Sequence, residues 1–174
     1  MTAHENPCYP IYIHEYPSWP GELRVALFLS TYVNKVDKKG RVSVPAQFRA
    51  ALASEGYQGI VVFRSNHHRA LEGVSWSFME EVGRRLDHFD LFSDSQDDLA
   101  TAVFGDSVQL PFDGDGRVVL PADLIDFAGV GEAAAFVGLG RKFQIWNPKE
   151  FKLRREDARK MVKAQGLTLP REVK

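Results

Sequence analysis

The stretch Asp37-Lys38-Lys39-Gly40-Arg41-Val42-Ser43-Val44-Pro45-Ala46 recurs 76 positions later as Asp113-Gly114-Asp115-Gly116-Arg117-Val118-Val119-Leu120-Pro121-Ala122. Asp, Gly, Arg, Val, Pro and Ala stand at the same places in both copies. An internal repeat indicates that one supersecondary unit is present twice, and such units usually share a core. The chain is therefore predicted to be a tandem duplication.

The first copy has the pattern of strand, tight turn, strand and short helix. Strand-forming residues at 28–33 precede the turn Lys38-Lys39-Gly40, and residues 41–44 alternate polar and apolar side chains. Pro45 suits the first position of a helix, because its missing N–H would be unpaired there, and helix formers continue to Leu52. A further strand is predicted at 60–63.

The second copy repeats this order. Strands are predicted at 108–112 and 117–120, and Pro121 opens a helix that Gly129 can terminate. Two more strands, 134–137 and 143–146, form a candidate hairpin. Each unit therefore reads as β, β, short α, β, β.

Three further helices are predicted outside the two copies. Ser77 and Glu80 have the spacing of a capping box, which predicts a helix at 78–87, and another helix is expected at 97–104. Asn147 can cap a charged helix that begins at Pro148 and is stopped by Gly166. The large aromatic side chains are expected in the core or between the units: Trp76, Trp146, Phe78, Phe89, Phe92, Phe104 and Phe143.

These patterns divide the chain into five parts. They are an irregular extension rich in proline (1–26), the first repeat (27–79), a helical connection (80–103), the second repeat (104–148), and a C-terminal helix and tail (149–174). The acidic group in and beside the connection is interpreted as solubilising rather than catalytic: Asp87, Asp90, Asp94, Asp97 and Asp98.

The two copies carry opposite charge. Residues 28–64 contain six basic and two acidic side chains, a net charge of +4, whereas residues 104–141 contain two basic and six acidic ones, a net charge of −4. The whole chain has a net charge of −1, so the local field is more informative than the total. One scaffold is thus expected to present two opposite surfaces.

Several classes of function are excluded or disfavoured. Cys8 is the single cysteine, so neither an intrachain disulfide nor a cysteine zinc site can form, which fits a reducing cytoplasm. No apolar run approaches the ~20 residues of a membrane span. His67-His68 lacks a third spaced ligand and is interpreted as a polar loop. No metal, cofactor or enzymatic activity is expected.

The string 32–45, its echo at 113–121 and Gln144-Ile145-Trp146 before the final helix together resemble the MraZ family of bacterial transcriptional regulators. The resemblance implies an α+β fold of two tandem AbrB-like swapped-hairpin β units that form a pseudo-dimeric barrel with short helices. It also implies a cytoplasmic, nucleoid-associated homo-oligomer, a closed ring, that binds repeated sites on double-stranded DNA in the promoter of the division and cell-wall gene cluster. Family members start near Phe28, so an upstream start codon is one explanation for the extension.

The first turn carries the chemistry that DNA contact requires. The ammonium groups of Lys38 and Lys39 suit phosphates, whereas the planar fork of Arg41 can bond two acceptors on a guanine edge. Lys35 and Arg49 are predicted as flanking phosphate contacts. DNA contact is expected less of the second turn than of the first, because Asp115 stands at the position of Lys39.

A structural interpretation of the same residues stays open. Aspartate and arginine stand four apart in both turns, as Asp37 with Arg41 and Asp113 with Arg117, so each pair can lock its turn by a charge-assisted hydrogen bond. Gly40 and Gly116 are expected to permit the turn backbone. The alternative function is an antitoxin-like protein-interaction module. An acidic, hydrophobic C-terminal tail would favour this alternative, and the C-terminal segment of this chain is basic instead.

Overall fold

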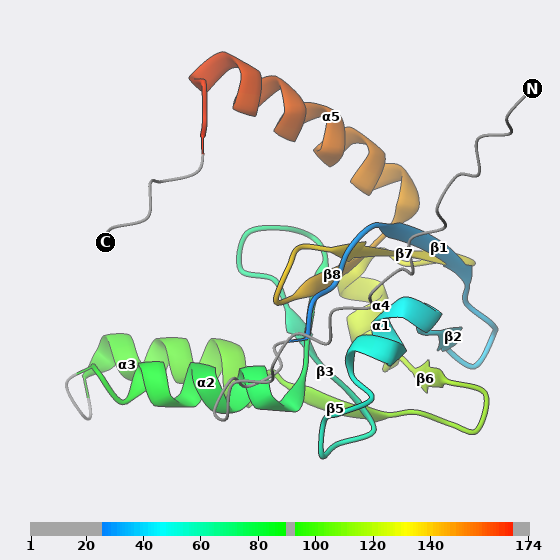
Figure 1. Ribbon diagram of the computed structural model, residues 1–174, viewed down its shortest axis with the longest axis horizontal. Helices are drawn as coiled ribbons and strands as arrows, with labels where there is room; N and C mark the ends of the chain where they lie inside the picture. The colour runs from blue at the N-terminus through cyan, green and yellow to red at the C-terminus, as the bar shows by residue number, and fades with distance from the viewer. Residues whose placement is uncertain (1–25, 90–92, 169–174) are drawn as a thin grey trace, which may run out of the picture.

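The computed structural model describes residues 26–89 and 93–168 (Figure 1). The predicted extension and the end of the predicted tail lie largely outside these residues, as do Cys8, Asp90 and Phe92. The element order within the two copies is the same, strand, strand, helix, strand, strand. The first copy contains β1 (Thr31–Lys35), β2 (Arg41–Ser43), α1 (Ala46–Ala51), β3 (Gly59–Arg64) and β4 (Leu71–Val74). The second contains β5 (Val108–Pro111), β6 (Arg117–Val119), α4 (Ala122–Ala128), β7 (Ala133–Gly138) and β8 (Phe143–Trp146).

Strands of one copy pair with strands of the other. All the pairs are antiparallel, in a six-stranded sheet of order β1-β7-β8-β4-β3-β5 and a separate two-stranded ribbon of β2 and β6. The α+β class and the predicted hairpin of 134–137 with 143–146 are therefore confirmed. The predicted closed barrel is not found among the described strands, because β1 and β5 end the order of the larger sheet.

One core is built from both copies. Phe28 and Phe48 from the first copy and Phe136 and Phe143 from the second are fully buried and contact one another edge-on or tilted, with Phe28 and Phe143 centroids 4.9 Å apart. Burial of one such side chain stabilises the fold by about 1.5–3 kcal/mol. Neither copy retains this aromatic cluster alone, so each half depends on the other.

The short helices start where the sequence predicts. Pro45 and Pro121 stand one residue before α1 and α4, at the N-cap rather than inside the first turn. Gly129 ends α4 in the left-handed conformation with φ of 60°. These prolines turn the chain from the β2–β6 ribbon into helices whose buried side chains, Phe48 and Leu124, reach the shared core.

Two helices form an arm between the copies, to the left in Figure 1: α2 (Trp76–Leu86) and α3 (Asp94–Ala100), the latter followed by a π-helical turn, η1 (Thr101–Gly105). The capping prediction was wrong by two residues. Ser75 caps α2 by accepting from the Phe78 N–H, and Glu80 accepts from Trp76 Nε1 instead of reaching back to the cap.

The core prediction was wrong for three aromatic residues of this arm. Trp76, Phe89 and Phe104 are each about two-fifths exposed. The arm extends away from the six-stranded sheet (Figure 1). It packs against the sheet through Met79, which is buried against Val61 of β3 and Val74 of β4.

The last helix, α5 (Pro148–Gln165), overhangs the six-stranded sheet (Figure 1). As predicted, Asn147 caps it by accepting from the Lys149 N–H, and Gly166 ends it with φ of 57°. It carries seven basic and three acidic residues, and no side chain of it is fully buried. No helix in the described part of the chain combines the length and apolarity needed to cross a bilayer.

Candidate nucleic-acid interface

The first turn, 37–41, is held by one carboxylate. Oδ1 of Asp37 accepts from the backbone N–H groups of Lys39 (2.8 Å) and Arg41 (3.0 Å), and Oδ2 accepts from Arg41 Nε (2.6 Å). These bonds lower the pKa of Asp37, chiefly through the Arg41 backbone N–H. Lys38 and Lys39 project into solvent from this frame. Arg41 is therefore bonded to the carboxylate that holds the turn.

Gly40 places this turn against the second copy. Its φ is +77°, and a Cβ atom built there would lie 2.6 Å from the Leu120 carbonyl oxygen. The Gly40 carbonyl in turn accepts from the Leu120 N–H at 2.9 Å. A side chain is excluded both by the left-handed backbone and by the neighbouring main chain.

The second turn, 113–117, has the same backbone frame. Asp113 accepts from the N–H groups of Asp115 and Arg117 (both 2.9 Å) and from Arg117 Nε (2.8 Å), and these bonds lower its pKa to about 2. Gly116 has φ of +71°. As the Asp–Arg spacing predicts, both turns are locked in the same way.

The two arginines differ in what surrounds their outer nitrogens. Arg117 Nη2 lies 2.6 Å from Asp115 Oδ2, so two carboxylates hold this guanidinium and raise its pKa. Lys39 occupies the corresponding place in the first turn. Within the described residues, Arg41 has no ion-pair partner besides Asp37. Its two Nη groups therefore remain available as donors.

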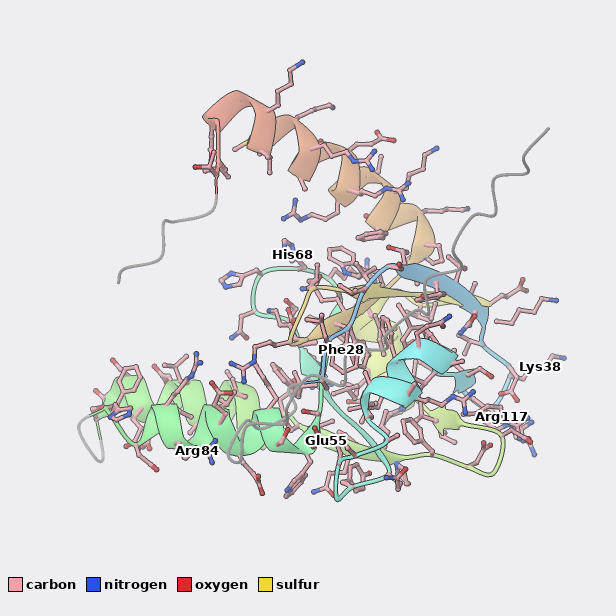
Figure 2. All side chains as sticks on the ribbon, in the orientation of Figure 1. Phe28, Lys38, Glu55, His68, Arg84 and Arg117 are labelled. Atoms are coloured by element: carbon pink, nitrogen blue, oxygen red, sulfur yellow. The ribbon has the colours of Figure 1, made fainter. Side chains whose placement is uncertain are left out.

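The β2–β6 ribbon brings both arginines to one face. Arg41 pairs with Val119 and Ser43 pairs with Arg117, so these four residues point to the same side of the ribbon. Val42 and Val118 point to the other side and are buried. Lys38 and Arg117 lie at the same end of the molecule (Figure 2). Val119 was not predicted as a site residue, yet it is 54% exposed on this face. Its alternation with buried Val118 was the available signal.

The predicted flanking cations lie in different surroundings. Lys35 is exposed at the end of β1. Arg49 is half-buried on α1, where its Nε donates to the Val44 carbonyl at 3.2 Å. A Cβ at Gly116 would lie 2.4 Å from Arg49 Nη1, so this guanidinium packs against the second turn. Arg49 thus links the segment after β2 to the second turn and adds positive charge there.

Some of the opposite charges on the two copies form ion pairs with each other within the chain. Arg64 at the end of β3 forms ion pairs with Asp106 and Asp123 of the second copy. The first turn contributes to no such pair across the copies, and its lysines keep their charge at the surface. The remaining positive field is therefore concentrated at the turn.

Comparisons with known proteins identify a matching family and several relatives. The family described as "MraZ protein, putative antitoxin-like" matches residues 103–165. A protein of Rickettsia akari (strain Hartford), named "Transcriptional regulator MraZ", is 43% identical over 143 residues, which cover 82% of this chain and 96% of the relative. A protein of the same name from Rickettsia bellii (strain OSU 85-389) is 42% identical over 144 residues, with coverage of 82% and 96%.

The chain belongs to the MraZ family. The resemblance on which the sequence analysis relied is thereby confirmed. The MraZ relatives are named as transcriptional regulators, and neither name describes an enzyme. The match at 103–165 runs from η1 to the end of α5 and therefore includes the acidic turn.

Proposed function

We propose that this chain binds double-stranded DNA through its first turn and regulates transcription of the bacterial division and cell-wall gene cluster from repeated promoter sites. The observation that carries the proposal is the difference between the two arginines. Arg41 is fixed by Asp37 yet keeps its Nη groups unpaired among the described residues, whereas Arg117 is held by two carboxylates. A preorganised guanidinium with two free donors suits a guanine edge.

The other cations have supporting roles. Lys38 and Lys39 neutralise phosphates on either side of the groove, and Lys35 and Arg49 contact the flanking backbone. A two-stranded ribbon can enter the major groove, so a recognition helix is not needed. Exposed Val119 beside Arg41 provides an apolar group that suits a thymine methyl.

We further propose that the chain acts as a ring-like homo-oligomer in the cytoplasm, associated with the nucleoid. One turn makes few base contacts, and several turns on repeated sites gain affinity by linkage. The acidic α3 and the basic α5 provide opposite surfaces for a head-to-tail contact, which closes into a ring if the rotation permits. Light scattering at low and high salt tests this electrostatic contact, and an unchanged mass would contradict it.

The decisive experiment compares two alanine variants in a gel shift. Arg41→Ala and Arg117→Ala each remove one Nε bond to the turn aspartate, and Arg117→Ala also removes the ion pair with Asp115, so each is the control for the other. On DNA from the chain's own upstream promoter, Arg41→Ala is expected to lower affinity about 100-fold, equivalent to ~2.7 kcal/mol, and Arg117→Ala less than about threefold. Shuffled DNA tests the sequence preference.

Two outcomes would contradict the proposal. Equal losses in the two variants, together with equal losses of stability, would leave the arginines a structural role only. Wild-type protein without preference for the promoter over shuffled DNA would remove the regulatory interpretation and favour the antitoxin-like interaction module.

A further inference from the structure

A second site candidate lies under α5, on the face of the sheet away from the ribbon turns. It is a cavity of about 400 Å³ between the first half of α5 and the sheet strands β4, β7 and β8. Its polar lining is supplied by seven residues from three segments: His67, His68, Glu72, Lys142, Gln144, Arg154 and Arg155. His68 is labelled at this place in Figure 2, apart from Lys38 and Arg117. The volume falls in the range of small-ligand pockets.

Glu72 is the chemically unusual member of this lining. It is 6% exposed, and its Oε1 accepts from Ser65 Oγ and Gln144 Nε2, both at 2.7 Å. Its Oε2 is also buried but accepts no hydrogen bond from the described residues. A buried carboxylate oxygen that accepts no hydrogen bond is costly unless a cation lies beside it.

Lys142 stands beside this oxygen. Its Nζ lies 3.1 Å from Glu72 Oε2, close enough for an ion pair but not aligned as a hydrogen bond. An ammonium donor and a carboxylate acceptor therefore lie next to each other at the cavity wall. Nucleobase edges present adjacent acceptors and N–H donors, which complement this pair.

The opposite wall is cationic. Arg154 and Arg155 project from α5, and within the described residues neither forms an ion pair. Burial and, to a smaller extent, the charge of Arg154 lower the pKa of His68, so the site favours the neutral imidazole. Three cations and one carboxylate give the lining a net charge of +2, which suits a phosphate dianion.

Flat and apolar groups lie between these two ends. The His68 ring lies 5.2 Å from Trp146, and Trp146 lies 6.0 Å from Phe151. Val137, Leu139 and Phe151 also line the cavity. Aromatic faces of this kind stack with nucleobases.

We propose that this cavity binds a 5′-mononucleotide, with its phosphate on Arg154 and Arg155 and its base edge on Glu72 and Lys142. The base then lies beside His68 and the apolar wall. This proposal does not rest on DNA binding by the turns, because the groups that carry it belong to α5, the β3–β4 loop, β4 and the β7–β8 loop.

Isothermal titration calorimetry of the full chain without DNA tests the site, using AMP, GMP, CMP and UMP as probes. At least one is expected to bind with a Kd below about 1 mM, and inorganic phosphate or the matching nucleoside at least tenfold more weakly. The double variant Arg154→Gln/Arg155→Gln should weaken the best probe at least tenfold. The matched control, Arg159→Gln/Lys163→Gln, removes two charges from the same helix outside the cavity lining and should change affinity less than twofold.

A third variant tests the base edge. Glu72→Gln keeps the shape of the side chain and should change which of the four bases is preferred. Circular dichroism confirms that each variant is folded. The proposal is overturned if no mononucleotide binds with a Kd below about 1 mM, if the control variant loses as much affinity as the cavity variant, or if inorganic phosphate binds as tightly as the best nucleotide.

Discussion

The two turns of this molecule share a backbone and differ in charge. Each aspartate accepts two backbone N–H groups and one arginine Nε, and each glycine adopts the left-handed conformation. The side chains between them differ, as Lys38 and Lys39 in one turn and Gly114 and Asp115 in the other. The frame that shapes the turn is thus separate from the charges that the turn presents. Substitutions can therefore address one without the other.

The substitution with the largest expected effect is Gly40→Ala, which disturbs the backbone of the first turn. An alanine at φ of +77° is strained, and its Cβ would lie 2.6 Å from the Leu120 carbonyl, which is main chain and cannot rotate away. We expect the free energy of unfolding to fall by about 3 kcal/mol. Gly116→Ala should cost less, about 1–2 kcal/mol, because its Cβ meets the side chain of Arg49, which can move. Urea denaturation measures both.

Gly114→Ala is the control for these variants. No atom lies within 4 Å of a Cβ at this position, so the unfolding free energy should change by less than about 0.5 kcal/mol. A loss at Gly114 equal to that at Gly40 would show that turn glycines matter for chain flexibility rather than for close packing between the copies.

The next largest effect is expected from Lys39→Asp, which reverses one charge of the first turn and should lower promoter affinity. This substitution gives the first turn the carboxylate that holds Arg117 Nη2 in the second. The new Asp should engage Arg41 and also repel phosphate, lowering promoter affinity about 30-fold, or ~2 kcal/mol, with stability nearly unchanged. Fluorescence anisotropy at several salt concentrations measures this loss and the flatter salt dependence. Lys39→Ala is the control, since it removes the lysine without trapping Arg41 and should lose less.

The reverse exchange, Asp115→Lys, should give a gain. It releases Arg117 Nη2 and adds a cation to the acidic turn, on the face of the ribbon that already carries Arg41. We expect affinity to rise about tenfold on promoter and shuffled DNA alike, with a steeper salt dependence by one to two counterions. A gain confined to promoter DNA would mean that the second turn already reads bases.

The turns were predictable because their determinants are local. The Asp–Arg spacing and the Gly before the arginine lie within five residues, and the structure contains both locks. The pairing of β1 with β7 and of β2 with β6 was not predictable from alternation, which shows which face of a strand is buried but does not identify the partner strand. The family resemblance implied a swapped-hairpin barrel without identifying these strand pairs, and the closed barrel was not found.

The cap of α2 shows a second kind of limit. Ser75 and Ser77 stand two residues apart and both suit an N-cap. The Glu55 carboxylate accepts hydrogen bonds from the N–H and the hydroxyl of Ser77. Ser75 therefore caps α2, by accepting from the Phe78 N–H. Glu55 is distant in sequence, so the local pattern could not choose between the serines. The cavity under α5 has the same origin, because its lining comes from three separated segments.

The smallest expected effect concerns pH and compares the same two carboxylates. Asp113 has a folded pKa of about 2, and its ordinary value is near 3.9, so the folded state favours the ionised form. A lowered pKa contributes stability that is present above the ordinary value and is lost as pH falls toward the folded value. The wild-type chain should therefore lose stability between about pH 4 and pH 2 in part through this group.

Asp113→Asn removes the titrating group and should flatten that part of the pH dependence in urea denaturation. Asp37→Asn should act in the same direction, because the pKa of Asp37 is also lowered by the bonds of its turn. Asp97→Asn, on the exposed arm helix α3, is the control for removing a negative charge. If the turn variants keep the wild-type slope, the carboxylates orient the arginines without stabilising the fold, and the loss of DNA affinity in Arg41→Ala would then belong wholly to the interface.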